Sequence, residues 1–126
     1  MTKIIIACLL FLSFIIYSGF IYTRGTASDI KIPVAEQKLA AEGKLIYQQY
    51  NCQSCHQIYG LGGYLGPDLT TAWSDPHRGE MLIKAMLVSG GNRMPVFGFN
   101  NEQIKALTAY LKYVDTTATP IKPGIR

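Results

Sequence analysis

The chain has 126 residues, carries a formal net charge of +4 and is 48% hydrophobic. A chain of this length forms one small domain around one compact core. Its lysines and arginines occur singly along the sequence, without a basic run, so the composition gives no support to a nucleic-acid-binding function.

The first apolar stretch is long enough to cross a membrane. From Ile4 to Tyr22 there are 19 residues without a charged side chain, and as a helix this stretch is about 28 Å long, close to the thickness of the hydrocarbon core. The apolar region of a signal peptide is shorter, about 7–15 residues, and no clear cleavage site follows this one. We therefore predict an uncleaved transmembrane anchor in the lipid bilayer over residues 1–24, with a cleaved signal peptide as the alternative. Residues 25–33 are predicted to form a short polar connector.

A helix is predicted from Val34 to Tyr50, because this segment is rich in helix-forming residues and its apolar side chains recur at helical spacing. Gly43 lies inside this segment, where glycine costs about 1 kcal/mol relative to alanine. The sequence therefore predicts that another helix approaches closely at Gly43, and a tolerated surface glycine is the alternative.

The predicted helix leads into Cys52-Gln53-Ser54-Cys55-His56, which is the Cys-x-x-Cys-His sequence of c-type haem attachment. Each thiol would add across one vinyl group of the haem, and two intervening residues place the two sulfurs about one helical turn apart. His56 would then ligate the iron. Zinc sites, redox-active dithiols and disulfides also use Cys-x-x-Cys, but a second ligand pair and a βαβ setting are missing, and a disulfide at this spacing would be strained. We therefore predict one covalently bound haem c.

Four glycines in the dozen residues after His56 predict a loop without regular secondary structure. Pro67 lies in this loop, and its carbonyl oxygen can accept a hydrogen bond although the residue has no N–H group. We predict that this carbonyl accepts the Nδ1 proton of His56 and fixes the imidazole ring, and that Leu69 packs against the porphyrin. An ordinary turn at Gly66-Pro67-Asp68 is the alternative.

A second helix is predicted over residues 76–88, with Ser74 as its N-cap and Gly90 and Gly91 directly after its end. Its apolar side is expected to consist of Met81, Leu82, Ala85, Met86 and Val88.

The loop after this helix contains the best candidate for the second axial position of the iron. Met94 is followed by Pro95, which stiffens the backbone, and by Phe97, which can form a wall of the haem site. Met81 and Met86 are expected at core positions of the preceding helix instead. We predict that Met94 ligates the iron, and plain packing is its alternative role.

The last helix has the clearest start in the sequence. Asn100 is a predicted N-cap, with Gln103 at the position that completes a capping box. Apolar residues then recur at helical spacing up to Val114. Residues 117–126 are predicted to form an extended tail.

The order of helix, Cys-x-x-Cys-His, Gly-Pro-Asp-Leu, helix, Met-Pro loop and helix resembles the class I cytochromes c over residues 35–115. The resemblance implies an all-α fold, with one N-terminal transmembrane helix and a cytochrome c domain over residues 34–116. It also implies that His56 and Met94 are the axial ligands and that Pro67 is the partner of the histidine. In that family, four residues bring the first and last helices together, and here they correspond to Gly43, Tyr47, Leu107 and Tyr110.

Two further segments, CQSCHQIYGLGGYLGPDLT and RMPVFGFNNEQIKALTAYLKYVD, resemble the family of cytochrome c subunits of bacterial nitric oxide reductases. This resemblance implies a non-catalytic electron-entry subunit in the bacterial inner membrane, with a single span and its haem domain on the periplasmic side. A soluble donor, such as a small cytochrome c or a cupredoxin, would deliver electrons. A large multi-helix catalytic subunit of the haem–copper type would receive them through its haem b. Trp73, Arg78 and Arg93 are candidates for binding the haem propionates.

Three other functions stay open at this point. A related oxygen reductase also fits the sequence, because membrane-anchored cytochrome c subunits occur in those enzymes. A free-standing membrane-anchored carrier is the second alternative, although the connector is short for a domain that swings between partners. A gas-binding haem protein would require that Met94 does not ligate the iron.

Overall fold

The computed structural model describes residues 2–25 and 32–118. Helix α1 covers Thr2–Phe20 and continues into a π-helical turn, η1, at Ile21–Gly25. The combined helix is long and apolar enough to span a membrane, with a mean hydropathy of 2.7 and no buried residue in its spanning window. A helix that could span a membrane is therefore present where the sequence predicts one, and its retention as an anchor stays a prediction. The connector predicted over residues 25–33 and the tail predicted over residues 117–126 lie mostly outside the described residues.

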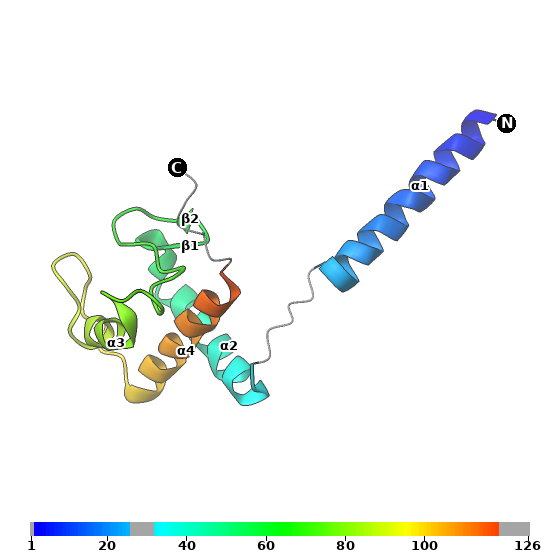
Figure 1. Ribbon diagram of the computed structural model, residues 1–126. Coiled ribbons are helices and arrows are strands. Elements are labelled where there is room, and N and C mark those ends of the chain that lie inside the picture. The colour runs from blue at the N-terminus through cyan, green and yellow to red at the C-terminus, as the bar shows by residue number, and fades with distance from the viewer. Residues whose placement is uncertain (1, 26–31, 119–126) are drawn as a thin grey trace.

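Two helices form the centre of the remaining domain (Figure 1). Helix α2 covers Val34–Gln49 and helix α4 covers Asn101–Thr117, so both agree with the predicted elements to within three residues. They cross at Gly43, where an added Cβ atom would collide with the backbone carbonyl of Ala106 and lie 2.8 Å from the Tyr110 Cβ atom. Tyr47 packs on Tyr110 at this crossing, with 5.5 Å between the ring centroids. The close helix approach predicted at Gly43 is confirmed.

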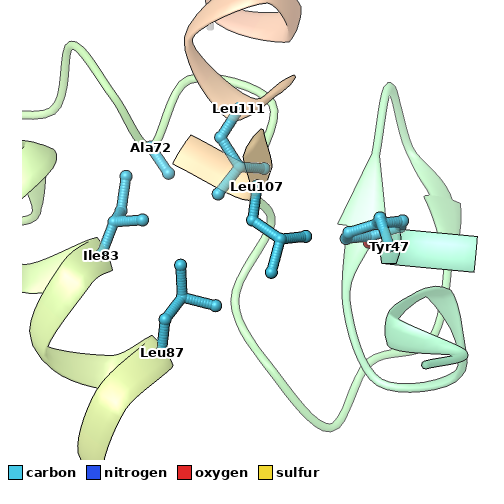
Figure 2. Close-up of a cluster of buried hydrophobic side chains, with 6 residues drawn as sticks. All are labelled: Tyr47, Ala72, Ile83, Leu87, Leu107 and Leu111. Atoms are coloured by element: carbon cyan, nitrogen blue, oxygen red, sulfur yellow. The ribbon is translucent and has the colours of Figure 1, made fainter. Parts of the chain in front are cut away.

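The buried core lies between these two helices and the third helix of the domain. Helix α3 covers Gly79–Ser89 and contributes its Ile83 and Leu87 side chains. Figure 2 shows how the side chains from the three helices and one loop meet in this cluster, which consists of Tyr47, Ala72, Ile83, Leu87, Leu107 and Leu111. Four of these core residues also line the cavity described below, namely Ala72, Ile83, Leu87 and Leu111.

The start of α4 is the predicted capping box. The Asn100 side chain accepts a hydrogen bond from the Gln103 backbone N–H at 2.9 Å, and the Asn100 backbone N–H donates to the Gln103 side chain at 3.0 Å. These two bonds satisfy donors that the first helical turn leaves unpaired.

The loop after His56 contains regular structure, so the expectation of an irregular loop was wrong. Strands β1, Gln57–Ile58, and β2, Leu61–Gly62, pair as a short antiparallel hairpin. The two turn residues, Tyr59 and Gly60, have φ values of 54° and 74°. Positive φ at both central residues is the geometry of the tight turns that join such hairpins.

Helix α3 begins three residues later than predicted, and Ser74 is not its N-cap. The Asp75 carboxylate accepts hydrogen bonds from the backbone N–H groups of His77 and Arg78 at 2.8 and 3.1 Å, which forms a separate turn before the helix. Gly79 then takes a φ of +53°, and the Ser74 hydroxyl donates to Asp115 at 3.0 Å instead of capping α3. The apolar side also differs from the prediction, because the buried residues of α3 are Ile83 and Leu87 whereas Met81 and Val88 are exposed.

Candidate haem site

A cavity of about 530 Å³ opens between the Cys-x-x-Cys-His segment, the loop that follows it, α3 and the Met94 loop. Its volume lies within the range of about 300–1,000 Å³ that is usual for cofactor and ligand pockets. All six residues predicted to bind the cofactor line this cavity, which brings together Cys52, Cys55, His56, Pro67, Leu69 and Met94. The sequence separation between the first and last of these residues shows that the tertiary fold, and not a local motif, builds the cavity.

Cys52 begins a single 3₁₀ turn, η2, over Cys52–Ser54, and Cys55 follows it as the C-cap residue. Asn51 has a left-handed backbone conformation with a φ of 53°, which turns the chain out of α2 just before the motif. The His56 backbone N–H donates to the Cys52 carbonyl at 2.9 Å and closes the turn. Both thiols are free and partly exposed in the cavity wall, and burial raises the pKa of the Cys52 thiol. The cysteines are therefore available as thiols on one side of the chain.

The His56 ring is fixed by the loop that follows it. Its Nδ1 atom lies 2.9 Å from the Pro67 carbonyl oxygen, which can only accept, so Nδ1 carries the proton and donates. This tautomer leaves the Nε2 lone pair for a metal ion. The Gly66 N–H donates to the Cys55 carbonyl at 2.8 Å, and a Cβ atom on Gly66 would run into the His56 ring. The predicted contact between His56 and Pro67 is thus present, and ligation itself stays a prediction.

The Pro67–Leu69 segment is tied to the turn that precedes α3. The Arg78 guanidinium donates to the Asp68 carbonyl oxygen at 2.8 Å and forms an ion pair with Asp75 at 2.7 Å. The hydrogen bond from Arg78, followed by the one from the His77 N–H, lowers the pKa of the Asp75 carboxyl below its usual value. Arg78 therefore stands at the cavity wall in a fixed position.

The Met94 loop forms the remaining wall. The Gly91 N–H donates to the Met94 carbonyl at 2.9 Å, and Gly90 has a φ of +66° where the chain leaves α3. Beside this loop, three aromatic rings form a cluster in which Tyr50 lies 5.6 Å from Phe97 and 4.8 Å from Phe99 between ring centroids. The Tyr50 and Phe97 side chains also line the cavity.

Several residues of the cavity wall were not predicted from the sequence, and one residue proposed for the propionates does not line the cavity. Tyr50 and Met86 both line the cavity, although Tyr50 was predicted only as a helix residue and Met86 only as a core residue. Tyr50 lies two residues before Cys52, and this position could have indicated that its side chain lines the cavity. No feature of the sequence indicated the same for Met86. Among the three residues proposed for the propionates, Arg78 and Arg93 line the cavity. Trp73 packs against the hydrophobic core instead, with the Lys112 ammonium group 6.0 Å from its ring centroid.

These residues fit a covalently bound haem. Two free thiols, one imidazole with an available Nε2 and two thioethers, those of Met86 and Met94, line the same predominantly apolar cavity, and two arginines stand at its wall. Within residues 2–25 and 32–118, His, Cys, Asp and Glu side chains form no cluster of three or more that would hold a metal ion by themselves. An imidazole and a thioether are side chains with which proteins ligate a haem iron, whose porphyrin supplies the other nitrogens.

Comparison with protein families agrees with this geometry. Residues 38–111 match the family described as cytochrome c oxidase, cbb3-type, subunit III, and this match covers more than half of the chain.

Curated relatives point in the same direction. The chain is 29% identical over 114 residues to the C subunit of nitric oxide reductase from Paracoccus denitrificans, which covers 79% of this chain and 72% of that protein. It is 28% identical over 85 residues to the corresponding nitric oxide reductase protein of Halomonas halodenitrificans, covering 58% of this chain and 57% of that protein. It is also 34% identical over 80 residues to the menaquinol:cytochrome c reductase cytochrome c subunit of Bacillus subtilis, covering 62% of this chain and 29% of that protein.

Proposed function

We propose that this chain, which belongs to the family of cytochrome c oxidase, cbb3-type, subunit III, is the electron-entry subunit of a membrane-bound respiratory reductase. The observation that carries this proposal is the meeting of Cys52, Cys55, His56 and Met94 in one cavity. When bound, the haem would supply a one-electron iron couple. His56 and Met94 would both hold the iron, and a haem held by two protein ligands would supply electron transfer and not bond-making chemistry.

The chain's own residues would hold and tune this group. Cys52 and Cys55 would form the thioether bonds, and the Pro67 carbonyl would keep the His56 ring in one orientation. Met94 would bind on the second side of the iron and raise the reduction potential. The apolar wall, which includes Leu69, would exclude water and limit rearrangement between the two oxidation states.

The partner is proposed from the relatives. Four of the curated relatives are nitric oxide reductase C subunits, so we place this chain beside a large multi-helix catalytic subunit of the haem–copper type that reduces nitric oxide. Helix α1 would be retained as an anchor in the bacterial cytoplasmic membrane, and the haem domain would lie on the periplasmic side. The anchor would raise the effective concentration of the haem domain beside its partner.

A second candidate is an oxygen-reducing complex, which the description of the matched family favours. The two candidates share the fold, the haem site and the direction of electron flow. They differ only in the chemistry of the partner protein, which reduces nitric oxide in one case and oxygen in the other.

The test is to isolate the full chain from native membranes in mild detergent and to identify what co-purifies. Consumption of nitric oxide and of oxygen would be measured on the same preparation, with haem staining of a denaturing gel to detect covalent haem. A Cys52→Ser, Cys55→Ser variant is the control and should lose both the stain and the turnover. A stoichiometric haem b subunit with nitric oxide turnover supports the proposal, and oxygen turnover supports the second candidate. Recovery of the chain alone, with stained haem, would reject both complexes in favour of a free-standing carrier.

A further inference from the structure

We propose that the tip of the β1–β2 hairpin and the loop after it, through Leu61, Tyr64 and Leu65, form the surface on which a soluble electron-donor protein docks by apolar contact without charge steering. This inference rests on the proposed function and adds the place and the chemistry of electron entry. The three residues are named the hairpin patch below.

The hairpin patch is exposed and apolar. Leu61, Tyr64 and Leu65 expose 76%, 87% and 67% of their surface. No Asp, Glu, Lys or Arg occurs between Lys44 and Asp68, so the patch and the whole haem-attachment motif belong to one uncharged segment. Depletion of charge together with an exposed tyrosine is typical of the centre of a protein–protein interface.

The patch is rigidly joined to the haem site. The Gly63 N–H donates to the Gln53 carbonyl at 2.8 Å, inside the attachment motif. A Cβ atom on Gly62 or Gly63 would collide with the backbone of the motif, so the hairpin lies directly on it. Leu65 belongs both to the exposed patch and to the cavity wall. A protein that covers the patch is therefore brought against the edge of the haem site, as electron transfer requires.

The position of the patch favours a partner that arrives from the aqueous phase. The chain enters the domain from the membrane helix at the first turn of α2, and the attachment motif follows its last turn. Helix α2 has 16 residues and is therefore about 24 Å long. Figure 1 shows the hairpin at the end of α2 that lies away from this entry point. A membrane-embedded protein or the lipid surface would meet the entry end more readily, so we commit the patch to a soluble donor.

A matched pair of exposed residues allows a direct test. Tyr64 in the patch and Met81 on α3 each expose 87% of their surface, but Met81 lies outside the uncharged segment. The variants are Leu61→Asp, Tyr64→Asp and the control Met81→Asp, each in the full haem-loaded chain in detergent. Leu65 is left unchanged because it also forms part of the cavity wall. Circular dichroism and the haem absorption spectrum establish that each variant is folded and loaded.

The probe is reduced azurin, a small blue-copper protein. Stopped-flow mixing measures its second-order rate of electron delivery, in which one Cu(I) is oxidised to Cu(II) and one Fe(III) is reduced to Fe(II). Binding is measured separately by titrating the chain into ¹⁵N-labelled azurin and following its NMR line positions. We expect Leu61→Asp and Tyr64→Asp to lower the rate and the affinity about tenfold, the effect of truncating an interface residue that contributes substantially to binding, and Met81→Asp to leave both unchanged. The wild-type rate should change little between about 0.01 and 0.15 M salt, although the Debye length falls over this range from about 30 to about 8 Å.

Several outcomes would overturn the assignment. Equal slowing in all three variants, no slowing in the patch variants, or a steep salt dependence would each reject apolar docking at this surface. If the patch variants instead lose binding to liposomes or lose a co-purifying membrane protein, while azurin still binds, the patch faces that partner and not the donor. If the wild-type haem is reversible in a redox titration but accepts no electron from azurin or from a soluble cytochrome c, the proposed donor step itself fails.

Discussion

Gly43→Ala should destabilise the haem domain, although alanine is the better helix former. Alanine inside a helix gains about 1 kcal/mol over glycine. The new methyl group, however, would collide with the Ala106 backbone carbonyl and with the Tyr110 Cβ atom at 2.8 Å. A backbone atom cannot move aside as a flexible side chain can, so α2 and α4 must separate along their contact. Overpacking costs about 1–3 kcal/mol, and with the upper value the net loss is about 2 kcal/mol. For a domain of this size, this loss lowers Tm by about 10 °C.

The assay is thermal unfolding of the full chain in detergent, followed through the haem absorption band. Circular dichroism is less suitable, because the helical signal of α1 would remain after the haem domain has unfolded. Ala41→Gly is the matched control, since Ala41 is exposed two residues earlier on the same helix and should lose only the propensity term of about 1 kcal/mol. Gly43→Ala and Ala41→Gly are opposite substitutions two residues apart, and both should therefore lower Tm. A Gly43→Ala variant that melts at the wild-type temperature or above would refute the close helix approach.

The remaining predictions concern the haem site and its support. Met94→Leu should lower the reduction potential and remove the charge-transfer band of methionine-bound ferric haem, and an unchanged band would exclude Met94 as a ligand. Gly66→Ala should press on the His56 ring and weaken its bond to iron, which a change towards a high-spin spectrum would report; an unaltered spectrum would contradict the tight contact. Asp75 has its pKa lowered by Arg78, so its contribution to folding is complete above its ordinary pKa of about 3.9 and is lost as the pH falls below it. Asp75→Asn should therefore lower the stability at pH 7 and flatten the loss of stability in acid, which denaturant unfolding at several pH values measures. Parallel pH curves for the variant and the wild type would mean that the ion pair does not contribute.

Short-range sequence patterns were sufficient to predict those parts of the structure that depend on residues close together in the chain. The capping box of α4 depends on two residues three positions apart, and both of its hydrogen bonds are present. Gly43 indicated a helix crossing because glycine in a helix has a cost that another interaction must offset. The attachment motif and Met94 were chosen as candidates by their chemistry, and the fold brings them to one cavity, while their bonds to a haem stay predictions.

The hairpin and the start of α3 could not be predicted in the same way. Two-residue strands carry no periodic pattern, and this hairpin is stabilised by distant groups: the Tyr59 hydroxyl donates to the Val114 carbonyl at 3.0 Å, 55 residues along the chain. Before α3, the Asp75 side chain competes with the helix for backbone N–H groups, as short polar side chains do. The choice between Ser74 as an N-cap and Ser74 as a donor to Asp115 depends on where α4 ends, which the local sequence does not determine.

The uncharged segment between Lys44 and Asp68 affects two properties, the reduction potential of the haem and the rate at which a donor protein delivers electrons. An apolar wall disfavours the more highly charged state of a buried group, whereas an opposite charge nearby favours it. A carboxylate introduced near the cavity should therefore stabilise the ferric form and lower the reduction potential. Leu65 lines the cavity whereas Leu61 does not, although both are exposed. Leu65→Asp should therefore lower both the potential and the rate of electron delivery, while Leu61→Asp, whose charge is screened by water, should lower the rate only. Redox titration of the two variants separates these effects, and an equal change in potential would show that Leu61 acts on the haem as strongly as the cavity-wall residue Leu65.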